Sequence, residues 1–316
     1  MNLREWNARL HGLVVFRALL DDPVVAKLVD LTDRMETCAP GHAAVCDAVA
    51  QFEAALFDHT VNWSDHLSAA VLETETVCVR QAAAGALSPV LQTALDRELA
   101  FLQALCGLTL DELLASAGSA AGQAQELDFL PRWETRPIDL PAAYAQRMSE
   151  AGKKGYGMFA KHHVFTVENG HLVPVKYPDP QKLSELPGYE GEREKVLANT
   201  RALLAGMPAN NVLLYGDAGT GKSSTVKAIA NEFASEGLRL VEVKKNQLYQ
   251  IPDLMDQLAA NPLKFILFID DLSFTANDDN FAALKAILEG SVGGRARNIA
   301  VYATSNRRHL IKETLT

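Results

Sequence analysis

The sequence is poor in cysteine and has no long apolar run. Its four cysteines lie in the first third of the chain, with no CxxC pair: Cys38, Cys46, Cys78 and Cys106. This spacing gives no support to a zinc site and favours reduced thiols buried in helices. No apolar stretch approaches the ~20 residues of a membrane-spanning helix. Charged side chains at Arg4, Glu5, Arg9 and Arg17 are unlike a signal peptide, so we expect a cytoplasmic protein with no membrane partner.

Basic residues are scarce in the N-terminal part. Residues 1–126 hold seven Lys and Arg against 17 Asp and Glu, a net charge of −10, whereas the rest of the chain holds 23 and 22, a net charge of +1. Binding to nucleic acid depends on Lys and Arg that neutralise phosphates, so the charge does not support a nucleic-acid partner. We interpret the acidic surface as a solvating one.

Proline is also rare in this part, where apolar residues recur at spacings of three and four. One such set is Trp6, Leu10, Leu13, Phe16 and Leu20. The pattern predicts an all-α N-terminal domain of four to six packed helices over residues 1–126. Asp21 or Asp22 before Pro23, and Ser88 before Pro89, are typical helix starts. The domain is an adaptor or regulatory module, or a structural extension of the domain that follows, and the sequence leaves both open.

Residues 127–180 are punctuated by proline and glycine and predict a connector. Two short strand-like runs, 163–167 and 172–175, flank Glu168-Asn169-Gly170, which is a hairpin signal. Basic and aromatic residues mix between Lys153 and His163. Because that cluster is short and the chain is acidic overall, we interpret it as a solvated linker.

From residue 181 to residue 316, buried strands alternate with helices. Strands are predicted over 212–215, 238–243, 265–269 and 298–303, and helices over 192–205, 224–233, 251–260 and 281–288. Continuous apolar strands separated by helices predict an α/β core with a parallel sheet between helices.

A glycine-rich loop follows the first of these strands. It reads Gly216-Asp217-Ala218-Gly219-Thr220-Gly221-Lys222-Ser223, and the helix that follows begins at Ser224. Strand, loop and helix in this order make a P-loop, whose backbone N–H groups and helix N-terminus bind phosphates. Lys222 is predicted to reach the β- and γ-phosphates, and the Ser223 hydroxyl to ligate Mg²⁺. The alternative, a glycine-rich turn without a ligand, does not account for the flanking strand and helix.

Two carboxylates end the third strand. Asp270 and Asp271 follow the apolar run 265–269 at the carboxyl end of the strand, where open α/β sheets bind ligands. The pattern resembles a Walker B motif, in which one carboxylate holds the Mg²⁺ shell and its neighbour polarises the attacking water. We assign Asp270 to the metal and Asp271 to the water. Many related motifs have Glu in the second place, so the shorter Asp predicts slow hydrolysis.

Asn306 ends the fourth strand, in the sequence ATSN. Its position matches a sensor 1 residue, whose neutral amide hydrogen-bonds the γ-phosphate and the lytic water without adding charge. Together with Lys222, Asp270 and Asp271, Asn306 completes the predicted catalytic set.

The order of P-loop, Walker B and sensor 1 resembles the AAA+ ATPase superfamily. The segments PANNVLLYGDAGTGKSS, FILFIDDLSF, ALKAILEG and YATSNRRHL resemble the bacterial AAA+ family catalogued as domain of unknown function 815, over about Asp179 to Leu310. The resemblance implies ATP or ADP and Mg²⁺ as ligands. It also implies that Gly188 and Tyr189 lie beside the adenine.

AAA+ proteins continue past sensor 1 with an arginine finger and a helical lid. This chain ends at Thr316, so the resemblance implies a core truncated before the lid, with weak nucleotide binding and poor hydrolysis in isolation. Four arginines occupy no standard lid position: Arg295, Arg297, Arg307 and Arg308. A longer parent chain is compatible with a homo-oligomer.

Two functions are compatible with these motifs. The first is an ATPase that couples Mg-ATP hydrolysis to remodelling of a macromolecular partner, and the second is an ATP-gated loader or adaptor in which hydrolysis is slow or incidental. A small-molecule kinase shares the P-loop but leaves Asn306 and the helical domain unexplained. The sequence does not identify the partner.

Overall fold

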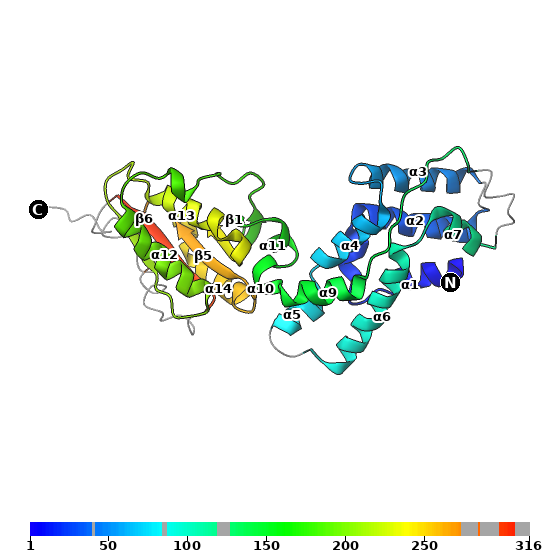
Figure 1. Ribbon diagram of the computed structural model, residues 1–316, viewed down its shortest axis with the longest axis horizontal. Coiled ribbons are helices and arrows are strands. Elements are labelled where there is room, and N and C mark those ends of the chain that lie inside the picture. The colour runs from blue at the N-terminus through cyan, green and yellow to red at the C-terminus, as the bar shows by residue number, and fades with distance from the viewer. Residues whose placement is uncertain (40–41, 84–86, 119–126, 273–283, 285–296, 307–316) are drawn as a thin grey trace, which may run out of the picture. The chain divides into compact units, whose positions relative to one another are not determined.

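The computed structural model describes every residue except 40–41, 84–86, 119–126, 273–283, 285–296 and 307–316 (Figure 1). The chain divides into two units, Met1–Ser149 and Glu150–Thr316, called unit 1 and unit 2 below. Unit 1 is all-α, and unit 2 contains the sheet.

Unit 1 is built from helices that bury their apolar faces in a shared core. In chain order they are α1 (Leu3–His11), the 3₁₀ helix η1 (Arg17–Asp21), α2 (Pro23–Thr37), α3 (Ala43–Phe57), α4 (Trp63–Glu73), α5 (Val77–Ala83), α6 (Pro89–Cys106), α7 (Leu110–Ser116) and α9 (Leu140–Ser149). Within the described part, seven α-helices precede residue 117, more than the four to six predicted. The seven-residue helices α5 and α7 are too short for a periodic signal.

Two of the predicted helix starts are confirmed. Asp22 caps α2 by accepting hydrogen bonds from the N–H groups of the first turn, and Ser88 caps α6 in the same way. Pro23 and Pro89 occupy the first position of each helix, where the missing N–H costs nothing.

All three tryptophans of the chain lie in unit 1. Trp63 and Trp133 pack edge-on against Phe52, with ring centroids 5.3 and 4.8 Å apart. Both indole N–H groups donate to backbone carbonyls at 2.8 Å, so neither ring buries an unsatisfied donor. Tryptophan emission therefore reports on unit 1 alone.

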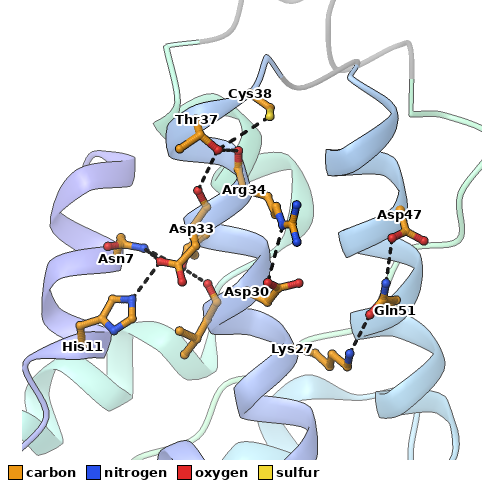
Figure 2. A network of polar contacts seen from close by, with 12 residues as sticks. Asn7, His11, Lys27, Asp30, Asp33, Arg34, Thr37, Cys38, Asp47 and Gln51 are labelled. Atoms are coloured by element: carbon orange, nitrogen blue, oxygen red, sulfur yellow. Dashed lines mark hydrogen bonds and ion pairs between the residues drawn. The ribbon is translucent and has the colours of Figure 1, made fainter.

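Polar side chains link the first three helices of unit 1 (Figure 2). Asn7 on α1 donates to the Asp33 carboxylate on α2 at 2.5 Å, and His11 contacts the same oxygen at 2.9 Å. Lys27 on α2 donates to Gln51 on α3 at 2.6 Å. Over the described residues as a whole, no three His, Cys, Asp or Glu side chains gather as a metal site would require.

Among the described helices, none alone has the length and apolar character to cross a membrane. α6 and α7 reach that length and composition only together, and the chain bends by 112° between them.

Unit 2 is a sheet between two layers of helices. Its helices are α10 (Ala151–Lys154), α11 (Met158–Lys161), η2 (Leu183–Glu185), α12 (Glu190–Leu204), α13 (Lys222–Glu232), η3 (Ala234–Glu236), η4 (Lys245–Gln250) and α14 (Ile251–Ala259). Its strands are β1 (Val164–Glu168), β2 (His171–Pro174), β3 (Val212–Tyr215), β4 (Leu238–Glu242), β5 (Lys264–Ile269) and β6 (Ile299–Ser305). The strand order is β2-β1-β4-β5-β6-β3, and every neighbouring pair is parallel except β1 with β2.

This unit is an α/β core with a mostly parallel sheet between helices, preceded by an all-α region, as the sequence predicts. The four strands of the predicted core all form, with ends within two residues of those predicted. The predicted helix over 281–288 falls outside the described residues apart from the buried Leu284, and Arg295, Arg307 and Arg308 lie outside them entirely.

Alternate side chains of the central strands face the two helical layers. In β5 and β6 the buried even-numbered residues pack with α12 and α13, and the odd-numbered residues pack with α14. Asp270, Thr304 and Asn306 continue the even-numbered series, so the period of two predicts that they emerge on the α13 side of the sheet.

β3 lies at an edge of the sheet and, among the described strands, pairs with β6. Val212 and Leu214 pack toward α12 and α13, but Leu213 is 37% exposed and Tyr215 is 53% exposed. The prediction that β3 is a buried strand is therefore wrong for one face. An apolar run alone does not distinguish an edge strand from a central one.

Asn199 on α12 hydrogen-bonds the backbone just before β3. Its side-chain amide bonds both the N–H and the carbonyl of Asn210, at 2.8 and 2.9 Å, and donates to the Tyr302 hydroxyl at 3.0 Å. That hydroxyl also contacts Thr200 Oγ1 at 2.8 Å, and burial raises the pKa of Tyr302. The P-loop strand is thereby fixed to α12 and β6.

The predicted connector over residues 127–180 is divided between the two units. Its first part forms α9 and belongs to unit 1, whereas β1 and β2 pair across Asn169 and Gly170, at the position of the predicted hairpin. β1 also pairs with β4, Val164 beside Leu240, and so extends the sheet of unit 2. Unit 2 therefore starts at residue 150 rather than 181, because a pairing between strands so distant in sequence leaves no local signal.

Candidate functional site

The loop between β3 and α13 turns on three glycines with positive φ. Gly216, Gly219 and Gly221 have φ angles of 150°, 80° and 77°, which other residues adopt only with strain. Thr220 Oγ1 donates to the Asp217 carbonyl at 2.9 Å and closes the loop. Left-handed residues within a short loop bring successive N–H groups to one side, where they form an anion-binding concavity.

α13 begins without a side-chain cap. Its N-cap is Gly221, and no side chain accepts from the first-turn N–H groups of the helix. The N–H groups of Lys222, Ser223 and Ser224 have no intrahelical acceptor, as in every helix start. Their partial positive charges therefore face the cavity described below and favour an anion there.

The Lys222 ammonium group folds back over the loop. Its Nζ donates to the carbonyls of Gly216 and Asp217, at 2.9 and 2.7 Å, and lies 3.4 Å from Thr220 Oγ1. A charged donor held only by neutral oxygens can exchange them for the stronger acceptors of a phosphate.

One oxygen of Asp270 joins three elements. Asp270 Oδ1 accepts hydrogen bonds from Ser223 Oγ on α13 and from Thr304 Oγ1 on β6, both at 2.5 Å, and from the Asp271 N–H at 3.1 Å. The register explains this meeting, because Ile269 of β5 lies beside Ala303 of β6 and the next residues are Asp270 and Thr304. The carboxylate thus lies at the start of α13, beside the glycine loop.

Asp271 adopts the left-handed conformation, with a φ of 53°. Its N–H donates to Thr304 Oγ1 at 2.9 Å, and its carboxylate accepts a hydrogen bond from Asn306 Nδ2 at 3.1 Å. Positive φ costs an L-residue on the order of 1 kcal/mol, least for Asn and Asp, and such residues cluster at functional sites.

These groups line one open cavity. Its walls are Ala218, Gly219, Thr220, Gly221, Lys222, Ser223, Ser224, Asp270, Asp271, Thr304 and Asn306. The Ser223 hydroxyl and the Asp270 carboxylate are the hard oxygen donors that Mg²⁺ takes, and this ion usually completes its shell with waters and substrate phosphates. The residues present therefore fit Mg²⁺ bound together with a phosphate ligand.

The structure brings together most, but not all, of the predicted site residues. Lys222, Ser223, Asp270, Asp271 and Asn306 line the same cavity. Gly216 and Asp217 are absent from its wall and instead supply the carbonyls that hold Lys222.

The two residues predicted beside the adenine lie apart from this wall. Gly188 and Tyr189, with φ angles of 69° and 58°, form the turn before α12 and do not line the cavity in the part of the chain that the structure describes. The Gly188 carbonyl accepts from Arg193, and Tyr189 is 57% exposed. A role for either residue in adenine binding stays a prediction.

Thr304 is the site residue that the sequence analysis missed. A single buried hydroxyl in an apolar strand carries no signal of its own. The available signal was its position two residues before Asn306, because alternate residues of a strand share one face.

Comparison with known families assigns the chain to one of them. The family model described as "Protein of unknown function (DUF815)" matches residues 159–316, half of the chain. The chain belongs to this family. The matched segment starts at Phe159, within unit 2 and before the hairpin, so the DUF815 region includes β1 and β2 as well as the predicted core.

Solved structures match this DUF815 protein only in part. PCH-2 from C. elegans has 20% identity and a TM-score of 0.31, over 39% of this chain and 38% of its own. AMPPCP-bound DnaA from Aquifex aeolicus has 20% identity and a TM-score of 0.29, over 42% and 44%. A RuvB mutant from Thermotoga maritima has 23% identity and a TM-score of 0.29, also over 42% and 44%.

The chain thus spans less than half the length of each of these three proteins, and TM-scores near 0.3 support no conclusion about function. No curated protein matches the chain.

Proposed function

We propose that unit 2 is an ATPase that couples Mg-ATP hydrolysis to remodelling of a protein partner. One observation carries the proposal: the Asp270 carboxylate lies 2.5 Å from the Ser223 hydroxyl, beside a glycine loop and an uncapped helix N-terminus. Anion-binding amides next to a pair of hard oxygen ligands suit a magnesium–nucleotide complex.

Phosphate binding falls to the loop and to α13. No side-chain cap occupies the N–H groups at the start of α13, so these groups and those of the loop from Ala218 are proposed to donate to phosphate oxygens. Lys222 would exchange the Gly216 and Asp217 carbonyls for phosphate oxygens. Ser223 and Asp270 would hold Mg²⁺, which, when bound, neutralises charge that develops on the phosphate oxygens.

Hydrolysis falls to Asp271 and Asn306. Water attacks the γ-phosphorus in line, and the bond between the γ-phosphorus and the bridging oxygen breaks, so that ADP leaves. A proton of the water passes toward the Asp271 carboxylate. The Asn306 amide, which already orients that carboxylate at 3.1 Å, would also donate to the γ-phosphate.

A second function, an ATP-gated loader or adaptor, has one observation in its favour. Asp271 is shorter than a glutamate and its carboxylate is held by Asn306, so it must reach an attacking water from further back. Under this alternative, ATP and ADP states select different partner affinities and turnover is incidental.

Two substitutions test the proposal. Lys222→Ala is expected to lower ATP affinity strongly, because it removes the only side-chain cation on the described cavity wall. Asp271→Asn is expected to keep ATP affinity within a few-fold and to lower the rate of phosphate release by about 10²-fold or more. Fluorescent nucleotide titration and phosphate release measure the two quantities. Wild-type protein that binds no nucleotide would overturn the proposal.

Partner capture separates the two functions. Asp271→Asn is expected to retain a protein partner in ATP if hydrolysis drives release, so partner recovery with ATP, with ADP and with the variant distinguishes remodelling from gating. A variant that releases its partner normally and supports function would favour the gated module. The −10 net charge of residues 1–126 favours protein over nucleic acid as the partner.

The adenine contact has its own test. Tyr189 lies at the N-cap of α12 with its ring exposed, and Tyr189→Ala is expected to weaken adenine nucleotides and to leave inorganic triphosphate binding unchanged. Equal affinity of wild type and variant for ATP would remove Tyr189 from the site.

A further inference from the structure

We infer that Thr304 is a positioning residue of this site, whose hydroxyl orients the Asp270 carboxylate toward Ser223 and fixes the backbone of Asp271. The inference rests on the proposed function, because it assigns Thr304 a part in Mg²⁺ and water placement. Neither the motif order nor the family match points to this residue.

The hydroxyl of Thr304 is used in both directions. It donates to Asp270 Oδ1 at 2.5 Å and accepts from the Asp271 N–H at 2.9 Å. A threonine hydroxyl has one proton, so donation to the carboxylate leaves only its lone pairs for the N–H group. With the residue 2% exposed, water has little access to replace either bond.

The backbone around Thr304 holds the same turn from a second side. The Leu272 N–H donates to the Thr304 carbonyl at 2.7 Å, and Ser305 Oγ donates to the Leu272 carbonyl at 2.7 Å. The end of β6 therefore binds Asp270, Asp271 and Leu272 in turn. This support maintains the left-handed conformation that directs the Asp271 carboxylate to Asn306.

Loss of this one hydroxyl would act on both carboxylates. Asp270 would keep Ser223 as its only side-chain donor among the described contacts and would lose the bond that opposes rotation toward solvent. The Asp271 N–H would lose its shorter bond and retain the 3.1 Å contact to Asp270. Groups that orient a metal ligand from behind typically contribute about 10- to 100-fold to metal affinity or activity.

The test compares Thr304→Val, Thr304→Ser and a matched control. Valine keeps the shape and removes the hydroxyl, whereas serine keeps the hydroxyl. Thr200→Val is the control. Thr200 lies on α12, is fully buried and hydrogen-bonds the hydroxyl of Tyr302, which is on β6 like Thr304, but Thr200 does not line the cavity. Affinity for a fluorescent ATP analogue is measured in EDTA and across a Mg²⁺ titration, together with phosphate release.

For Thr304→Val we expect ATP affinity in EDTA within about twofold of wild type and a half-saturating Mg²⁺ concentration raised by about 10-fold or more. For Thr304→Ser we expect a half-saturating Mg²⁺ concentration within about threefold of wild type. For Thr200→Val we expect a lower melting temperature and an unchanged half-saturating Mg²⁺ concentration. If Thr304→Val does not fold, Thr304→Ala, which adds no bulk, takes its place.

Two results would overturn the inference, and they are distinguishable. A wild-type protein whose nucleotide affinity and turnover do not depend on Mg²⁺ would overturn the proposed function and this inference together. A Mg²⁺-dependent wild type with a Thr304→Val variant that only melts earlier, as Thr200→Val does, would overturn this inference alone.

Discussion

Asp271 occupies a conformation that few side chains tolerate. This residue, with a φ of 53°, follows the end of β5, and it is held by Thr304 of β6 and by Asn306, which comes directly after β6. Asp and Asn populate this region more readily than longer side chains. The local backbone therefore favours Asp at a position where related motifs have Glu.

Replacement of Asp271 by Glu is expected to destabilise unit 2. The longer side chain loses the tolerance of the left-handed region and displaces the Asn306 contact, at a cost on the order of 1 kcal/mol. Asp271→Asn is the control, since it keeps both shape and backbone preference. Calorimetry compares the unfolding of the two variants. A Glu variant that melts at or above the wild-type temperature would show that the turn is not strained.

Glu53 is a second residue with an unusual environment. It lies on α3 with only 2% exposure, and neither carboxylate oxygen meets hydrogen-bond geometry within the described residues. Burial raises the pKa of Glu53 from about 4.5 to about 7, against smaller lowering effects of the Arg132 charge and the Trp133 N–H. The folded state therefore favours the protonated side chain.

The stability of unit 1 is expected to fall as pH rises between about 4.5 and 7. In that window the folded state binds a proton that the unfolded state has released, so the free energy of unfolding decreases with pH, by about 3 kcal/mol at most. Below the window the contribution is fully present, and above it the loss is complete. Glu53→Gln removes this dependence. Urea titrations followed by tryptophan emission measure it, and parallel pH profiles for both proteins would contradict the assignment.

At the scale of elements, Arg239 ties the start of unit 2 to its sheet. This residue of β4 is 4% exposed and donates to the Phe159 carbonyl at 2.9 and 2.8 Å, and to the Ala234 and Leu238 carbonyls at 2.9 and 2.8 Å. The planar guanidinium group also donates to the Lys154 carbonyl at 3.3 Å and so reaches four carbonyls at once, which a lysine ammonium group does not.

Arg239→Lys is expected to destabilise unit 2 by about 2–4 kcal/mol, because several buried carbonyls lose their donor. The matched control is Arg201→Lys on α12, whose exposed ion pair with Glu194 contributes ~0.5 kcal/mol or less. Calorimetric unfolding compares the two variants. Equal effects of both substitutions would mean that the buried network adds nothing beyond a surface pair.

Sequence patterns predicted the elements of the core better than their neighbours. β5 and β6 carry apolar runs and appear close to the predicted limits, and the Asp270 and Asn306 motifs fall directly after them. The pairing of β1 with β4 and the edge position of β3 depend on contacts between distant segments. The hydroxyl of Thr304 acquires its role only when β6 lies beside β5.

At the scale of the whole molecule, the two units are distinct bodies with separate cores. The described core clusters of the sheet draw only on residues from Phe159 onward, and the tryptophan core belongs to unit 1. We therefore expect unfolding of the chain to depart from a single two-state transition.

Mg-ATP is expected to stabilise the unfolding transition of unit 2. Free ligand at 100 times its dissociation constant adds about 2.7 kcal/mol to the state that binds it. The transition seen by tryptophan emission reports on unit 1 and is expected to shift less. Calorimetry and emission, recorded on the same sample with and without nucleotide, measure the two transitions. An unchanged calorimetric trace in saturating ATP would contradict a site in unit 2.

The position of β6 between β3 and β5 has a mechanical consequence. On one side this strand is hydrogen-bonded to β3, which carries the glycine loop, and on the other to β5, which carries Asp270. Asn306 follows directly after the same strand, and the polypeptide continues from it. Tension applied beyond Asn306 would therefore load the contact with Asp271 first, and would be transmitted to both halves of the cavity along one strand.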